Sequence, residues 1–229
     1  MLDCADLAEA VAVARRVEQW RPDVVDVVAA SRSVLVTTRD AAFLPELRRR
    51  LGALLSESPA RLRDPSVGAA AGAEVERREV EITVRYDGPD LSGVSELAGL
   101  SPQELVRRHT SITWSAAFGG FAPGFFYLID ERELLGRAAD DARLATDTLP
   151  SDTLPSDTLP PVPRLASPRP RVPAGSVGLA DRFCAVYPGA SPGGWRLLGT
   201  TDAVLWDANL PAPALLAPGM RVRFREATP

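Results

Sequence analysis

The stretch Val80-Glu-Ile-Thr-Val-Arg-Tyr86 alternates apolar side chains with charged or polar ones. This period of two is typical of a β-strand with one buried face. The same alternation returns near the other end of the chain, from Met220 to Arg225. Between the two stretches the apolar segments are short, and turn-forming Pro-Gly and Gly-Gly pairs are frequent. The pattern predicts a mainly β unit, a closed barrel, over residues 79–229.

The first part of the chain has a different pattern. Apolar residues spaced three to four apart predict amphipathic helices over residues 5–20 and 43–55. Two short strands, Val24–Val28 and Ser33–Thr37, are expected between these helices. The small residues from Pro65 to Ala73 have the composition of a linker. We therefore predict an α+β protein in which a small α/β domain with its linker, residues 1–78, precedes the barrel.

The composition disfavours several classes of function. A net charge of −4 provides no basic field for a nucleic acid, and all 26 basic residues are arginine. No apolar run approaches the roughly 20 residues that a membrane helix needs. Cys4 and Cys184 are too few for a disulfide framework and lack metal-ligand spacing, and no signal-peptide pattern opens the chain. We expect a cytoplasmic protein with no metal site of its own.

The most irregular apolar stretch is Gly119–Leu128, in which glycine and proline stand among aromatic residues. Such a stretch fits neither a regular helix nor a strand, and it predicts a shaped loop that lines a cleft. Three residues would let the backbone approach a ligand closely: Gly120, Pro123 and Gly124. Phe121, Phe125 and Tyr127 could form walls of the cleft, although entry into the barrel core is the favoured interpretation for Phe125.

The only histidine, His109, follows a strong helix start. Ser101 can cap the helix, Pro102 suits its first turn, and Glu104 can complete a capping box. His109 is a candidate for proton transfer or substrate binding because an unperturbed imidazole titrates near neutrality. A purely structural hydrogen bond is the alternative.

Residues 146–160 contain a pentapeptide that occurs three times, first as Thr-Asp-Thr-Leu-Pro and then twice as Ser-Asp-Thr-Leu-Pro. A proline every five residues prevents a regular helix or a central strand, and single leucines build no core. We predict a disordered insertion here, without a function of its own.

Eight short motifs in the second unit occur together in a recognisable order. They are His109-Thr110, Gly120–Leu128, Pro163-Arg-Leu165, Pro168-Arg169, Val172–Gly178, Tyr187-Pro188, Ser191–Trp195 and Pro218-Gly219. This series resembles the B subunit of bacterial ATP-dependent 5-oxoprolinase. The same family is known as allophanate hydrolase subunit 1, as KipI and as carboxyltransferase subdomain C/D.

The resemblance implies a cyclophilin-like fold for the barrel. It also implies a hydrolase component that is inactive alone and acts with the A and C subunits of 5-oxoprolinase, using ATP and magnesium, to convert 5-oxoproline into L-glutamate. Two alternatives stay open within the family. One is a KipI-like regulator that inhibits a sensor histidine kinase, and the other is a component associated with allophanate hydrolysis.

Phosphorylation of the lactam oxygen would make the carbonyl carbon of 5-oxoproline electrophilic, and this chemistry needs cations for the phosphates. Arg164 and Arg169 lie inside family motifs and are candidates for binding a carboxylate or phosphate. Ser176, with neighbouring backbone N–H groups, could hold an oxyanion. Since the chain has neither lysine nor a phosphate-binding loop, the nucleotide site is expected to be shared with a partner.

The chain departs from the family pattern in three places. Phe183 and Cys184 replace a Gln-Thr pair, and Thr200 replaces an arginine. The family's opening strand motif is missing, because the chain begins almost directly in its first helix, and we therefore expect an incomplete first sheet. If the replaced polar groups contact substrate, activity is altered or lost.

Overall fold

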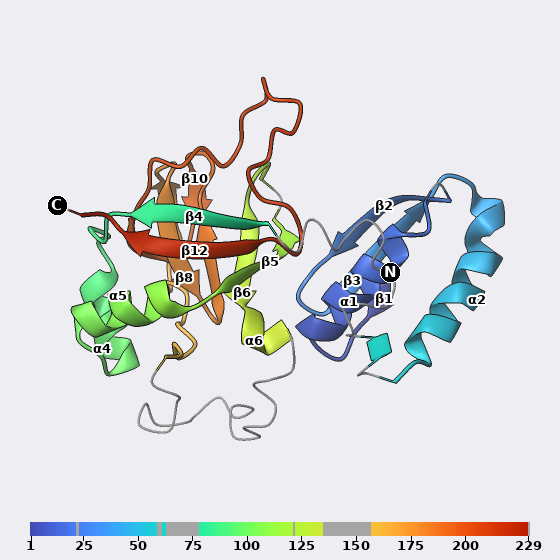
Figure 1. Ribbon diagram of the computed structural model, residues 1–229, viewed down its shortest axis with the longest axis horizontal. Helices are drawn as coiled ribbons and strands as arrows, with labels where there is room; N and C mark the ends of the chain where they lie inside the picture. The colour runs from blue at the N-terminus through green and yellow to red at the C-terminus, as the bar shows by residue number, and fades with distance from the viewer. Residues whose placement is uncertain (22, 59–60, 63–77, 121, 135–156, 229) are drawn as a thin grey trace.

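The computed structural model describes residues 1–21, 23–58, 61–62, 78–120, 122–134 and 157–228. Within these residues the protein contains a small sheet with helices, formed by the first part of the chain, beside a larger barrel-like sheet formed by the rest (Figure 1). Each sheet has a hydrophobic core of its own. This arrangement confirms the predicted α+β class with a β-barrel second unit.

The N-terminal unit forms a three-stranded antiparallel sheet in the order β1-β3-β2. Its elements are β1 (Leu2–Asp3), α1 (Leu7–Glu18), β2 (Val24–Ala29), β3 (Ser33–Thr38), the 3-10 turn η1 (Ala41–Phe43) and α2 (Leu44–Leu55). Asp6 caps α1 by accepting a hydrogen bond from the Glu9 N–H at 2.8 Å. The sequence led us to expect an incomplete first sheet, but a short opening strand does form, because β1 pairs with β3.

The second unit is built around a seven-stranded sheet in the order β11-β8-β9-β6-β5-β12-β4. Its strands are β4 (Glu79–Val84), β5 (Trp114–Gly119), β6 (Phe126–Asp130), β8 (Ser176–Ala180), β9 (Phe183–Val186), β11 (Arg196–Thr200) and β12 (Arg221–Glu226). A separate antiparallel pair joins β7 (Arg169–Val172) to β10 (Ser191–Gly193). The helices are α4 (Leu91–Ala98), α5 (Pro102–Ser111) and the short α6 (Glu131–Leu134).

A single bridge brings the two edge strands together and nearly closes the barrel. Arg85, just after β4, and Thr200 of β11 exchange two backbone hydrogen bonds of 2.8 Å each. Glycine is required at this seam, since a Cβ at Gly199 would collide with the Arg85 carbonyl oxygen. A Cβ at Gly88 would likewise collide with the Leu197 carbonyl oxygen.

The two faces of the barrel sheet carry different side chains. On β9, Cys184 and Val186 point into the barrel core, whereas Phe183 and Ala185 belong to a cluster on the outer face. A register shift between Ala116 and Phe118 of β5 interrupts the alternation there. The sheet therefore separates the interior core from a second apolar cluster on its outer face, against which Leu7 and Val11 of α1 and Ala29 of β2 pack.

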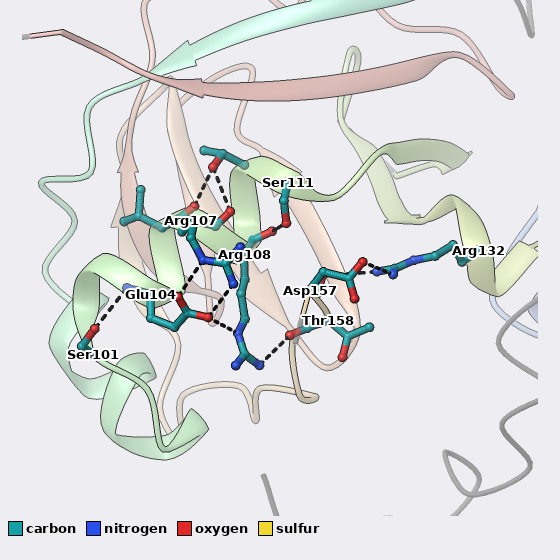
Figure 2. Close-up of polar contacts among 10 residues, drawn as sticks. Ser101, Glu104, Arg107, Arg108, Ser111, Arg132, Asp157 and Thr158 are labelled. Carbon is teal, nitrogen blue, oxygen red and sulfur yellow. Dashed lines mark hydrogen bonds and ion pairs between the residues drawn. The ribbon is translucent and has the colours of Figure 1, made fainter. Parts of the chain in front are cut away.

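Polar contacts around α5 hold the end of the pentapeptide repeat in place (Figure 2). The predicted cap is confirmed, since the Ser101 hydroxyl accepts from the Glu104 N–H at 3.1 Å, while the Glu104 carboxylate binds Arg107 and Arg108 at 2.7 Å each. Arg108 also donates to the Thr158 carbonyl at 3.2 Å.

Arg132 binds the Asp157 carboxylate at 2.6 Å, and Leu159 packs against the barrel core. The last four residues of the predicted insertion, 157–160, are thus anchored to the barrel. Residues 146–156 lie outside the described residues.

Candidate functional site

His109 lies in the barrel interior and not at the edge of a cleft. Its side chain is 0% exposed, and its ring centroid is 4.7 Å from that of Phe224. His109 Nδ1 lies 2.7 Å from the Tyr86 hydroxyl, and Nε2 lies 3.3 Å from Cys184 Sγ. The Trp114 indole N–H donates to the His109 carbonyl at 3.1 Å. These contacts are those of a structural residue and not of a group that meets a substrate.

All three groups of this buried network are neutral at pH 7. Burial lowers the pKa of His109 to about 3, and burial raises the pKa values of Tyr86 and Cys184. A neutral imidazole has one donor and one acceptor nitrogen, which suits the hydroxyl on one side and the thiol on the other. The geometry supports the structural alternative for His109, because a fully buried ring has no path to a substrate.

The outer face of the sheet carries a cluster of six aromatic residues, here called the outer aromatic cluster. Its members are Phe118, Phe125, Tyr127, Phe183, Tyr187 and Trp195. Tyr127 lies at its centre, with ring centroids 4.5 Å from Phe118, 5.4 Å from Phe183 and 5.3 Å from Trp195. Small residues such as Ala117, Ala180 and Ala185 form the floor beneath these rings.

The two predicted arginines lie at the margin of this cluster, beside Trp195. The Arg164 guanidinium carbon is 5.7 Å from the Trp195 ring centroid. Arg169 donates to the Trp195 carbonyl at 3.3 Å and binds Asp90 at 2.8 Å. Burial has the largest effect on the pKa of Tyr187 and raises it, while both arginines lower it. The Pro-Arg and Gly-Gly-Trp motifs therefore meet in space.

Arg164 and Arg169 differ in their partners. The Arg169–Asp90 pair is largely buried, and Asp90 also accepts from the Leu197 N–H at 2.7 Å. Arg169 thus acts as a clamp that holds β7 against β11. Arg164 is exposed, and among the described residues it has no carboxylate partner. An exposed guanidinium beside an aromatic ring can accept an incoming carboxylate or phosphate.

The segment Gly119–Leu128, here called the glycine-rich loop, forms a tight turn at the edge of the cluster. The Gly120 N–H donates to the Phe125 carbonyl at 2.8 Å. Gly124 has a φ of 77°, and a Cβ there would lie 2.8 Å from the Leu205 carbonyl oxygen. Phe125 joins the outer aromatic cluster, and it is Phe126 that packs against the barrel core. The favoured interpretation of Phe125 as a core residue is thus corrected. Pro123 is exposed, and Phe121 lies outside the described residues.

Ser176 is buried in β8 beside Tyr187, whose N–H donates to the Ser176 carbonyl at 2.9 Å. The backbone groups that could have completed an oxyanion site are already used. The Gly175 N–H donates to the Tyr187 carbonyl, and the Ser176 N–H donates to the Pro173 carbonyl. In this conformation Ser176 supports the ladder and does not offer an anion site.

The three residues that replace family residues, Phe183, Cys184 and Thr200, lie in different environments. Cys184 points into the barrel and contacts His109, whereas Phe183 belongs to the outer aromatic cluster. The Thr200 hydroxyl donates to Asp87 at 3.0 Å at the barrel seam. Of these positions, only Phe183 can alter the surface that surrounds Trp195.

Within the described residues, no three His, Cys, Asp or Glu side chains gather in a way that could hold a metal ion. No helix among these residues is long and apolar enough to cross a membrane. Both cysteines are free and buried.

Asp90 was missed by the sequence reasoning, although it fixes Arg169. Its only local signal is the turn sequence Asp87-Gly-Pro-Asp90. The distance along the chain from Asp90 to Arg169 hides their contact, because no pattern in the sequence indicates that β7 folds back toward this turn.

Comparisons with known proteins agree with one another. The family described as "Carboxyltransferase domain, subdomain C and D" matches residues 1–139 and 154–216. The B subunit of 5-oxoprolinase from Escherichia coli O157:H7 is 33% identical over 231 residues, which cover 96% of this chain and 89% of that protein.

Two solved structures share the fold. The crystal structure of TTHA0988 is 32% identical with a TM-score of 0.65, and the match covers 100% of this chain but 39% of that one. This chain therefore spans well under half of that polypeptide. Urea carboxylase from Kluyveromyces lactis has a TM-score of 0.62 over 97% of this chain at 14% identity, a likeness of fold alone.

Proposed function

The chain belongs to the family of carboxyltransferase domains of subdomain C and D, and on that premise we propose that it is the B subunit of an ATP-dependent 5-oxoprolinase. In this proposal it acts in the cytoplasm with the A and C subunits to hydrolyse 5-oxoproline to L-glutamate, and its barrel is of the cyclophilin-like kind. The Escherichia coli relative of that name supports the proposal, since the two proteins align over most of both lengths.

The structural observation that carries the proposal is the meeting of four separate motifs at Trp195. The glycine-rich loop contributes Phe125, and the Pro-Arg-Leu motif contributes Arg164. The Tyr-Pro motif contributes Tyr187, whose ring centroid is 5.4 Å from that of Phe125. These motifs are far apart in sequence and converge at Trp195. Since Phe118, Phe183, Tyr187 and Trp195 are at most 9% exposed, we assign substrate binding to the exposed margin of the cluster at Arg164.

The chemistry of this surface suits the substrate. 5-Oxoproline is a small lactam ring that carries one carboxylate. The exposed Arg164 guanidinium can form a forked pair with the carboxylate or with a phosphate oxygen, and the half-buried rings of Phe125 and Tyr127 belong to the adjoining cluster. Gly120 and Gly124 keep the neighbouring backbone tightly turned, while Pro123 lies exposed beside it.

ATP enters the proposal as co-substrate, because amide resonance makes direct attack of water on the lactam slow. Of the two motif arginines, Arg164 is the one free to meet a phosphate, since Arg169 is held by Asp90. The described residues do not fit a magnesium site of their own, so none of them is given a role in binding that ion. In this proposal the nucleotide site is completed by the C subunit.

Proton transfer does not fall to His109 in this proposal. Its ring is fully buried, and it faces the interior of the barrel while Trp195 lies on the outer face. His109 instead ties α5 to β9 through Cys184.

Reconstitution from purified proteins tests the proposed function. The A and C subunits from the same organism are mixed with 5-oxoproline and ATP, with and without this chain, and glutamate release is followed. We expect turnover only when all three proteins and ATP are present. Equal turnover without this chain would contradict the assignment. Inhibition of a sensor kinase's autophosphorylation by this chain, with no effect on glutamate release, would favour the regulatory alternative.

A further inference from the structure

Large exposed apolar side chains gather in the segment between β11 and β12. Four of them lie there: Val204 is 67% exposed, Trp206 39%, Leu210 54% and Leu215 36%. Exposed apolar residues scattered singly are normal on protein surfaces, whereas several of them in one short segment are a feature of many interaction surfaces. We call Pro123 together with these four residues the end surface.

The end surface is built on ordered backbone. The Asp207 N–H donates to the Pro213 carbonyl at 2.8 Å, and the Leu215 N–H donates to the Leu205 carbonyl at 3.0 Å. Trp206 and Ala214 form a bridge between these bonds. Figure 1 shows this segment, coloured orange to red, projecting from one end of the barrel beyond β4 and β12. Its apolar side chains are therefore presented to solvent by a defined hairpin-like excursion.

The barrel anchors this excursion at both of its ends. Leu205 and Leu216 are buried in the barrel core at 1% and 3% exposure. The intervening Leu210 and the neighbouring Leu215 cannot reach that core, because the backbone bonds fix them on the projecting part. Their exposure is a property of the fold and is not relieved within the described part of this chain.

The glycine-rich loop lies against the same excursion. A Cβ at Gly124 would lie 2.9 Å from the Trp206 Cβ, so that only glycine allows this approach. Pro123, the neighbour of Gly124, is exposed beside it. One edge of the loop thus supplies Phe125 to the outer aromatic cluster, and the other edge adjoins the end surface.

The end surface carries almost no free charge. From Leu197 to Met220 the sequence has no basic residue and two carboxylates, Asp202 and Asp207. Asp202 is paired with Arg85 at 2.7 Å, and Asp207 accepts from the Asn209 backbone at 3.0 Å and from its side chain at 2.9 Å. The centres of protein interfaces are similarly depleted of charged residues and enriched in aromatic ones.

We propose that the end surface is the docking site for the C subunit, and that this partner meets it with an apolar, charge-poor face. This inference rests on the proposed function. A second protein fits better than a second copy of this chain, because in TTHA0988 the region matched by this chain is only 39% of one polypeptide, so that further protein is joined to it. Docking there places the partner next to the glycine-rich loop, and hence next to Arg164 and Trp195 through Phe125.

Calorimetric titration with the purified C subunit tests the docking site. Leu210→Asp introduces a charge into the end surface, and Leu97→Asp is its matched control, because Leu97 of α4 is also 54% exposed. We expect Leu210→Asp to weaken binding and to raise the dissociation constant by about 30-fold or more, as for a central interface residue. Leu97→Asp is expected to stay within about twofold of the parent. Thermal unfolding of both variants checks that the barrel is intact.

The outcomes separate this inference from the proposed function. If the parent chain binds the C subunit and supports glutamate release, but Leu210→Asp binds equally well, the docking site is wrong and the function stands. If the parent chain does not bind the C subunit, both are wrong. A homodimer of the parent chain that Leu210→Asp dissociates, seen by light scattering, would assign the surface to a second copy and overturn the docking site.

Discussion

The two faces of strand β9 show how one element serves two purposes. Cys184 and Val186 face the barrel interior, where His109 and Tyr86 form a closed, neutral network. Phe183 and Ala185 face outward, into the cluster that Arg164 borders. The chain's single histidine lies on the interior face, while the exposed guanidinium lies at the outer one. Residues that look equally reactive in a sequence can thus be separated by the thickness of a sheet.

The two faces therefore have different roles, one in stability and the other in binding. Side chains on the interior face are fully buried and stabilise the barrel through packing and matched hydrogen bonds. The cluster on the outer face is also largely buried, but Arg164 at its margin is exposed beside Trp195 and can bind an anionic ligand. Substitutions on either side of the sheet test whether stability and activity separate along this boundary.

Replacement of His109 by alanine should have the largest effect, and on stability alone. It leaves a cavity and removes the partner of the Tyr86 hydroxyl, which should cost about 3 kcal/mol in the free energy of unfolding. Glutamate release per folded molecule in the reconstituted complex should be unchanged. Urea unfolding and active-fraction assays measure the two quantities. A loss of turnover in the folded fraction would restore His109 as a catalytic candidate.

Replacement of Arg164 by alanine should have the opposite signature. The side chain is exposed and has no carboxylate partner among the described residues, so the free energy of unfolding should change little. We expect kcat/KM for 5-oxoproline in the complex to fall by about 10- to 100-fold, or about 1.4–2.8 kcal/mol. Arg182→Ala, which breaks an exposed pair with Glu133, is the control. Equal turnover in both variants would remove Arg164 from the site.

The loss of stability at acidic pH should reveal the protonation of His109 on the interior face. The pKa of His109 is about 3 in the folded state and about 6.5 in the unfolded chain. Between these values the unfolded chain binds more protons, so the stabilising contribution is complete above about pH 6.5 and is lost as the pH falls. The loss approaches about 1.4 kcal/mol per pH unit. His109→Gln should reduce this slope between pH 6.5 and 5, as measured by urea unfolding. Identical slopes would show that the histidine is accessible to protons in the folded state.

Replacement of Arg225 by glutamine should have the smallest effect. Arg225 lies on an outward position of β12 and pairs with Glu81 at 3.4 Å in an exposed setting. Such pairs contribute less than about 0.5–1 kcal/mol, and the residue lies away from the aromatic cluster. Neither the unfolding midpoint nor turnover should change. A clear loss of activity would mean that the substrate-binding surface extends around the barrel as far as β12.

The elements of the fold were largely predictable from local patterns. Spacings of three and four residues predicted α1 and α2, and strict alternation predicted β4 and β12. The burial of His109 could also have been predicted, because Leu105, Val106 and His109 are spaced three and four residues apart and share the buried face of α5. A histidine was predicted to be functional from its residue type, whereas its position in the helix indicates burial.

The site was less predictable, because its parts meet through long-range pairing. Leu165 donates to the Gly194 carbonyl at 2.8 Å, and this bond brings Arg164 beside Trp195. The register shift after Ala116 decides that Phe118 faces outward beside Tyr127. Neither feature follows from alternation or from turn propensity. The family resemblance identified the motifs, but their spatial arrangement could not be predicted from the sequence.

The parallel pairing of β4 with β12 has a consequence for folding during synthesis on the ribosome. β12 lies between β4 and β5, so the sheet stays divided until the last strand of the barrel has emerged. Synthesis from Val84 to Arg221 takes on the order of 10 s at about 5–20 residues per second. During that time β4 exposes both of its edges, while the N-terminal unit has all of its strands and can fold. Until translation ends, the nascent barrel therefore carries unpaired strand edges, which are the kind of edge that can pair with another chain.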